Sequence, residues 1–295
     1  MFKYVANAIK RFHHKHPRKQ QDQPYPHIKT IYGAKSQYSP DADDSPLLEP
    51  ADKKIVQEVT GIFLYYARSV DATMLTYFVS IATQQANPTK NKIKKVTQFL
   101  DYSASHPDAI ITYHASNMVI AGHSDASYLS ETKSCNRTGG RFFMSNNSAI
   151  PPKNGAIIAI AQIIKSVMSS VAEAKLGTLF INCRESIPSR HALEEMGHKQ
   201  TTTPMQTDNT TVLGVVTSNI ASKRLKSMNM KLHWLRCRAI QEQFRHYWQA
   251  GPTNLGDYVT KHHAAIHHHT LHGTYLTPKQ QLDLLRQICA LNTTP

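Results

Sequence analysis

The stretch Asn117–Ser130, NMVIAGHSDASYLS, is the starting point for predicting the fold. It is predicted to form a buried strand, and that strand carries a carboxylate. The apolar run is short and is followed by small polar residues, a pattern typical of a strand. Asp125 lies in the middle or at the end of this strand, where a carboxylate is costly unless it is paired or binds a metal. Either a satisfied structural acid or a functional carboxylate fits this pattern.

Short apolar runs at 109–116, 139–146 and 155–162 predict further strands around this one. The residues that follow alternate between helical and strand patterns. We expect helices near 169–177, 187–199 (with Pro188 near its start), 210–220, 223–243 and 256–263, and strands near 203–209 and 244–251. Strands first and then mixed elements indicate an α/β or α+β fold around a mixed sheet.

The part before the first strand has a different character. Residues 1–30 contain seven Lys or Arg and one acid, Asp22. Residues 5–16 could form a short basic helix followed by an extended Pro- and Gln-rich segment, and the alternative is a solvated, partly disordered basic arm. A Pro-rich acidic linker follows, and residues 52–102 show apolar positions at helical spacing, as expected for two or three packed helices. The apolar run 61–82 contains Arg68 and Asp71, so it predicts a buried helix rather than a membrane span.

The composition favours a polyanionic partner. The chain of 295 residues carries 34 Lys and Arg against 20 Asp and Glu, a formal net charge of +14. Nucleic acid therefore ranks ahead of an anionic membrane as a partner. The four cysteines are widely spaced, as in reduced intracellular proteins, and no secretory signal is evident, so we expect an intracellular, cytoplasmic location, with a virus-like particle or the nucleus as alternatives.

Two further aspartates follow predicted elements. Asp208 ends the strand near 203–209, and Asp257 opens the helix near 256–263. Each could serve as a helix N-cap, a role that Asp fills readily. Their spacing alone does not bring them to Asp125. The helix that contains VAEAKLG also places Lys175 and Glu173 on different edges of its apolar face.

Five motifs in order resemble the ribonuclease H domain of copia-type retrotransposon pol polyproteins. The matching segments are HSDASYLSE with TGGRFFMS, SSVAEAKLGTL, QTDNTTVLGV, KSMNMKLHWLRCR and NLGDYVTKHH, within residues 117–263. Residues 59–113 are similar to that family's segment between reverse transcriptase and ribonuclease H. No Y-x-D-D motif of polymerase catalysis occurs in the chain.

The resemblance implies a ribonuclease H-like fold, a mixed five-stranded sheet flanked by helices and preceded by a helical connection segment. It implies four domain parts: a basic arm and linker left from the end of reverse transcriptase (1–50), a helical connection segment (51–112), a ribonuclease H-like domain (113–263) and a His-rich solvated tail (264–295). In this family, carboxylates hold two Mg²⁺ (or Mn²⁺) ions that cleave the RNA strand of an RNA/DNA hybrid. Asp125, Asp208 and Asp257 match three of the four metal-binding acids.

The fourth acid is replaced. The family's glutamate aligns with Lys175, and an ammonium group about 4 Å from a cation costs roughly 4 kcal/mol per unit charge at an effective dielectric of 20. Glu173 could substitute only after a shift of the helix register. Asn229, Leu232 and Cys237 also depart from the family pattern, which suggests a degraded or repurposed copy.

The expected function is a ribonuclease H-like protein that binds RNA/DNA hybrid, with cleavage impaired by Lys175. The alternatives are a competent ribonuclease H endonuclease and a non-enzymatic basic nucleic-acid-binding or scaffold protein. Lys165, Lys223, Arg224 and Lys226 are candidates for contacts with nucleic acid. A reverse transcriptase part of the same polyprotein is a further candidate partner.

Overall fold

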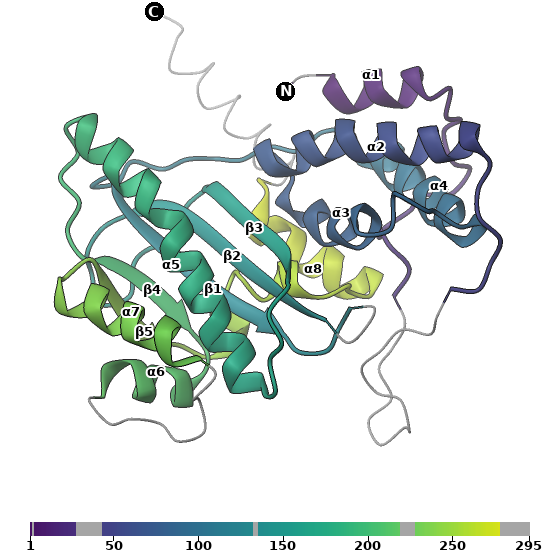
Figure 1. The fold of residues 1–295 in the computed structure, drawn as a ribbon. Coiled ribbons are helices and arrows are strands. Elements are labelled where there is room, and N and C mark those ends of the chain that lie inside the picture. Colours follow the sequence, from purple (N-terminus) through teal and green to yellow (C-terminus); the bar gives the residue numbers. More distant parts are fainter. Residues whose placement is uncertain (2, 28–42, 132–134, 219–227, 278–295) are drawn as a thin grey trace, which may run out of the picture.

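The structure, a computed structural model, describes residues 1, 3–27, 43–131, 135–218 and 228–277 (Figure 1). Five strands form one mixed sheet: β1 (Val119–Ser127), β2 (Asn136–Ser145), β3 (Ala156–Ile164), β4 (Thr203–Thr207) and β5 (Phe244–Trp248). The strand order is β3-β2-β1-β4-β5. β1, β2 and β3 are antiparallel neighbours, whereas β4 runs parallel to β1 and β5 parallel to β4. The predicted mixed five-stranded sheet flanked by helices is confirmed.

Helices cover both faces of the sheet because β1 is apolar on both. Ile120 and Phe142 face a core that includes Leu176 and Leu179 of α5 (Val171–Glu195). The next residues in the chain, Ala121 and Phe143, belong to the core on the opposite face. Figure 1 shows α5 crossing in front of the sheet and α8 (Ala265–Tyr275) behind it. α6 (Thr210–Thr217) and α7 (Asn229–Ile240) lie beside α5, near β4 and β5.

A second group of helices, drawn at the right in Figure 1, lies beyond β3. It contains α1 (Tyr4–Arg11), α2 (Pro50–Ser69), the 3-10 turn η1 (Ala72–Met74), α3 (Leu75–Ala82) and α4 (Lys90–Ser105). Aromatic rings fill its core, and Tyr77 stacks on Phe99 with 4.3 Å between ring centroids. The helices predicted over 52–102 are therefore confirmed. None of the helices in the described ranges is both long and apolar enough to cross a bilayer.

The short helix predicted near the start of the chain is confirmed, whereas the predictions that the two chain ends are solvated are wrong. The start of the basic arm forms α1, whose Val5 and Ala8 are buried against the second group of helices. The first part of the predicted solvated tail forms α8, where Tyr275 is buried beside the sheet core. In both cases a few apolar residues within a strongly polar segment supply a buried face, which the net composition hides.

Other element boundaries also differ from the sequence predictions. The two helices predicted around 169–199 are one helix, α5, which continues through Pro188 although proline removes a helical N–H. Residues 109–116 form no regular strand, and the predicted helix at 256–263 is a single 3-10 turn, η5 (Tyr258–Thr260). Packing of α5 along the sheet outweighs the local cost at Pro188.

A buried polar cluster joins the second group of helices to the sheet. Arg137 of β2 is fully buried and donates to the Glu131 carboxylate and to the Ser80 hydroxyl of α3, the latter at 2.7 Å. His262 lies 2.9 Å from the same hydroxyl, and its imidazole stacks on Tyr25. Burial holds the pKa of His262 well below its usual value, so this imidazole is neutral. The guanidinium thus joins β2 to Glu131 and to Ser80, and His262 and Tyr25 complete the cluster.

We expect Glu131→Ala to destabilise the protein by about 3–5 kcal/mol, since it leaves the Arg137 guanidinium buried without its counterion. The double variant Glu131→Leu with Arg137→Met removes both charges and should recover most of this loss. Urea unfolding of both variants measures the difference. A double variant as unstable as Glu131→Ala would contradict the assignment of the loss to an unpaired buried charge.

Candidate functional site

Asp125 lies in β1, a strand buried on both faces, and its side chain is 1 % exposed. It pairs across the sheet with Gly139 of β2. A Cβ at Gly139 would stand 2.3 Å from the Gly256 carbonyl oxygen, so the glycine lets the loop before η5 lie directly on the strand. From this loop and turn, Thr260 donates its hydroxyl proton to Asp125 Oδ2 at 3.1 Å.

Asp208 comes to the same end of the sheet because β4 runs parallel to β1. It follows the last residue of β4 directly, and its side chain is 17 % exposed. The helix after it is capped by Asn209, whose side chain accepts from the Val212 N–H at 2.9 Å. The N-cap alternative for Asp208 is therefore wrong.

Asp257 approaches from the loop between β5 and η5. It makes no side-chain cap bond to the turn that follows, and it accepts instead from Lys261 Nζ at 2.7 Å. Asp257 therefore stands at the N-cap position of η5 but does not cap it through its carboxylate. Lys261 holds the pKa of Asp257 below its usual value, although burial alone would raise it.

Lys175 lies between two of the three carboxylates. Its Nζ donates to Asp125 Oδ1 at 3.0 Å and makes a second, shorter hydrogen bond to Asp208. The side chain comes from the second turn of α5, which lies across the sheet at this end, and it is 14 % exposed. The structure thus places Lys175 in direct contact with two of the three aspartates.

Two ammonium groups, those of Lys175 and Lys261, face three carboxylates. Burial raises the pKa of Asp125 to about 6, and Lys175 opposes that rise while Asp257 and Asp208 add to it. The same contacts raise the pKa of Lys175 although burial alone would lower it, so the ammonium stays charged. The site therefore compensates most of its own charge.

Glu173, the other acid on this helix, is committed elsewhere. Its carboxylate accepts from the Ser169 backbone N–H and hydroxyl, both at 2.7 Å, and its own N–H donates to the Ser170 hydroxyl. This reciprocal arrangement caps the start of α5. The register shift that would make Glu173 the fourth acid of the site is not observed.

The residues present do not fit a metal centre. Mg²⁺ is bound through one or two carboxylates in near-octahedral geometry. The Lys175 ammonium instead occupies hydrogen-bonding positions on Asp125 and Asp208 that such an ion would require. Over the ranges that the structure describes, no three His, Cys, Asp or Glu side chains are placed to hold a metal ion.

Two residues of the site were not predicted from the sequence, and some of the predicted nucleic-acid contacts lie outside the described part of the chain. Thr260 and Lys261 were not predicted, although Lys261 stands four residues after Asp257, a spacing that brings side chains together on a helical turn. Of the candidate nucleic-acid contacts, Lys165 is exposed at the end of β3, whereas Lys223, Arg224 and Lys226 lie outside the described residues. Leu232 is buried in the core against α5, so its departure from the family pattern serves packing.

Comparisons with known proteins bear on the fold alone. The sequence matches no protein-family model and no curated protein. Among solved structures, the N-terminal ribonuclease H domain of Rv2228c from Mycobacterium tuberculosis is 12 % identical, with 48 % of this chain and 91 % of that chain covered and a TM-score of 0.33. LC11-RNase H1, isolated from compost, is 10 % identical over 48 % of this chain and 92 % of its own, with a TM-score of 0.36.

A longer match is to the foamy viral protease-reverse transcriptase in complex with double-stranded DNA. It is 11 % identical, covers 73 % of this chain and 40 % of that chain, and has a TM-score of 0.39. The strand order and directions described above are those of the mixed five-stranded sheet that the sequence resemblance implies.

We expect Lys175→Met to cost about 3–5 kcal/mol of stability at pH 7, because it leaves buried carboxylates without their counterion. The penalty should shrink at pH 5. Without Lys175 the pKa of Asp125 rises further above its unfolded value, so the folded state keeps a proton there and becomes relatively more stable as the pH falls. Urea unfolding at both pH values, with the exposed Lys94→Met as control, measures this. An equal penalty at pH 5 and pH 7 would contradict the electrostatic origin.

Proposed function

We propose that this chain is a ribonuclease H-like module of copia-type retroelement origin that binds RNA/DNA hybrid or related nucleic acid without cutting it. The observation that carries the proposal is the Lys175 ammonium bonded to Asp125 and Asp208. Between these two carboxylates, the lysine supplies a fixed positive charge where a divalent ion would otherwise supply it. The carboxylates then stabilise the fold rather than a reaction.

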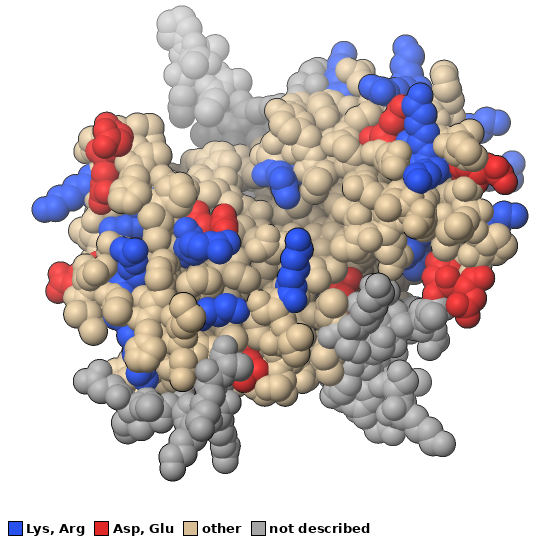
Figure 2. Space-filling model, in the orientation of Figure 1, with Lys and Arg blue, Asp and Glu red and all other residues tan. Residues whose placement is uncertain are grey.

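Charge supports the binding part of the proposal. The net charge of +14 favours a phosphate backbone as partner, because each phosphate that Lys or Arg neutralises releases bound counterions. Lys165 precedes the loop that leads into α5, and Lys231 of α7 donates to Ser166 in that loop at 3.4 Å. These two ammonium groups therefore lie at the end of α5 that also carries Lys175. Figure 2 shows Lys and Arg scattered over the face that carries α5, interspersed with acidic side chains.

Recognition of a hybrid would rest on shape. A-form and hybrid duplexes are gripped through their phosphates and 2′-hydroxyls, not through base sequence. The proposed partner is therefore a duplex with at least one RNA strand. The domain divisions at residues 50 and 112 are part of the same proposal. The division predicted at residue 263 is not kept, because α8 packs against the sheet.

A cleavage and metal-binding series tests the loss of catalysis. We expect no hybrid cleavage by the wild-type chain in Mg²⁺ or Mn²⁺, and no rise in its melting temperature with either ion. Lys175→Glu adds a carboxylate and removes the competing ammonium, so Mg²⁺ should raise its melting temperature by roughly 5 °C at saturation. Lys175→Gln, which removes the charge but adds no acid, is the matched control.

Two outcomes of that series would overturn the proposal of an inactive site. One is wild-type cleavage that Asp125→Asn abolishes, which would identify a competent endonuclease. The other is equal stabilisation of the wild type and Lys175→Glu by Mg²⁺. Cleavage that Lys175→Glu gains and that Asp125→Asn removes again would support the proposal directly.

A salt titration tests binding of nucleic acid at this end of α5. The double variant Lys165→Glu with Lys231→Glu should bind a labelled RNA/DNA hybrid more weakly, and the slope of log affinity against log salt should fall by about 0.9 for each phosphate that the variant no longer neutralises. The double variant Lys90→Glu with Lys94→Glu, on the distant helix α4, controls for the equal change in net charge. Unchanged slopes in the double variant would place the nucleic acid elsewhere, and absence of hybrid binding by the wild type would refute the function.

A further inference from the structure

The outer edge of β3 is the floor of an open groove. β3 ends the sheet, and within the described part of the chain no other strand pairs with its outer edge. The groove has a volume of about 460 Å³, and six consecutive strand residues, 157–162, line it. Consecutive strand residues point to opposite faces, so only a groove that runs along the edge of the strand touches them all.

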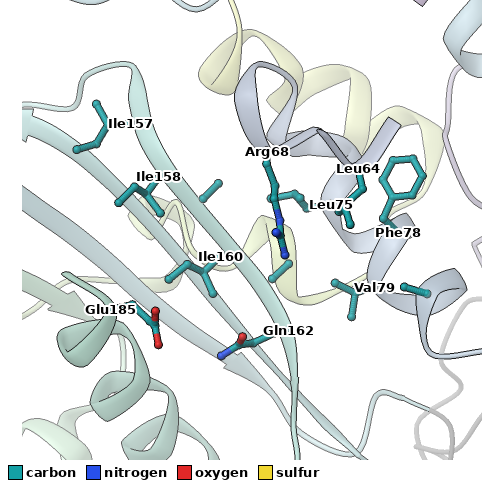
Figure 3. Close-up of a pocket in the computed structure, with 13 residues that line it drawn as sticks. Leu64, Arg68, Leu75, Phe78, Val79, Ile157, Ile158, Ile160, Gln162 and Glu185 are labelled. Atoms are coloured by element: carbon teal, nitrogen blue, oxygen red, sulfur yellow. The ribbon is translucent and has the colours of Figure 1, made fainter. Parts of the chain in front are cut away.

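Helices form the walls of this groove. Leu64 and Arg68 of α2 and Leu75 and Phe78 of α3 line one wall (Figure 3). Glu185 of α5 stands on the opposite side, paired with Arg184 at 2.8 Å. Figure 3 shows the Arg68 side chain between the strand and α3. The groove therefore offers an apolar wall, a strand edge and one guanidinium.

The strand itself lacks the usual protection of an edge. Edge strands of monomers are blunted by charged residues, prolines or short length, because their free N–H and C=O groups pair readily with other chains. β3 reads AIIAIAQII over nine residues, without a charge or a proline. The backbone groups of alternate residues point away from β2 into the groove. Such an edge is a template for an added strand.

The guanidinium of Arg68 favours an added strand that carries an acidic side chain. Its guanidinium has no hydrogen-bond or ion-pair partner among the described residues, whereas the one acid on the lining is neutralised by Arg184. A bound chain with an acidic side chain would satisfy Arg68, and the overall charge of +14 would draw an acidic segment in.

We propose that the groove between β3 and helices α2 and α3 binds an extended acidic-apolar peptide segment of a partner protein, which adds to the sheet as a sixth strand beside β3. Its backbone would pair with β3, alternate apolar side chains would pack against the partly exposed Leu64, Val79 and Ala82, and a carboxylate would pair with Arg68. This site is independent of the Lys175 site, which lies at an end of the strands rather than along the outer edge of the sheet.

Fluorescence anisotropy with synthetic peptides tests the proposal. The probe is a fluorescein-labelled eight-residue peptide of alternating valine and glutamate. We expect saturable binding, a loss of at least tenfold with Arg68→Glu, and less than a twofold change with Lys94→Glu, which alters net charge equally. A peptide with proline at two central valine positions should bind at least tenfold more weakly, because it lacks strand N–H groups.

Several results would overturn it. No binding of the glutamate peptide, or equal binding of a valine-lysine peptide, would refute the acidic-strand ligand. Equal losses in Arg68→Glu and Lys94→Glu would show only non-specific charge attraction. A wild-type dimer in sedimentation velocity that Arg68→Glu dissociates would assign the groove to a second copy of the chain. Hybrid affinity, measured in parallel, should respond equally to Arg68→Glu and Lys94→Glu, which separates this site from the nucleic-acid surface.

Discussion

The Lys175 ammonium between Asp125 and Asp208 is the contact on which the sheet domain depends. Three carboxylates converge at one end of the sheet, and mutual repulsion in a buried setting would be severe without counterions. Lys175 supplies one charge from α5 and Lys261 supplies another from the segment after η5. The strand, helix and turn that bring acids together are thus held by the same ion pairs.

The need to balance the charge of these aspartates can be met in two ways, which have different chemical consequences. A ribonuclease H-like sheet requires the parallel pairing of β1 with β4, and that pairing brings Asp125 and Asp208 together whatever occupies the space between them. A metal ion and a lysine satisfy the same electrostatic need, yet only the former activates water. A single lysine on α5 can therefore balance these carboxylates without a metal ion, which is the basis of the proposal that the site does not cut nucleic acid.

The second group of helices is part of this architecture rather than an appendage. The buried Arg137 guanidinium joins β2 to Glu131 and to Ser80 of α3, and α2 and α3 form a wall beside β3. Because this wall stands off the strand edge, it leaves the groove open instead of covering it. The contact that joins the two halves and the groove that we assign to an added strand are consequences of one arrangement.

The sequence by itself predicted the five strands of the sheet and the helical group before it, and it suggested Lys175 at the place of an acid in the family it resembles, because strand periodicity and motif order are local properties. Only the tertiary structure decided the ion pairs of Lys175 and Lys261, the capping role of Glu173, and the burial of α1 and α8. These depend on which segments meet in space: Asp125 and Lys175 are fifty residues apart along the chain and bond only because α5 lies across β1. Composition averaged over each terminal segment likewise concealed the few apolar residues that anchor it to a core formed elsewhere.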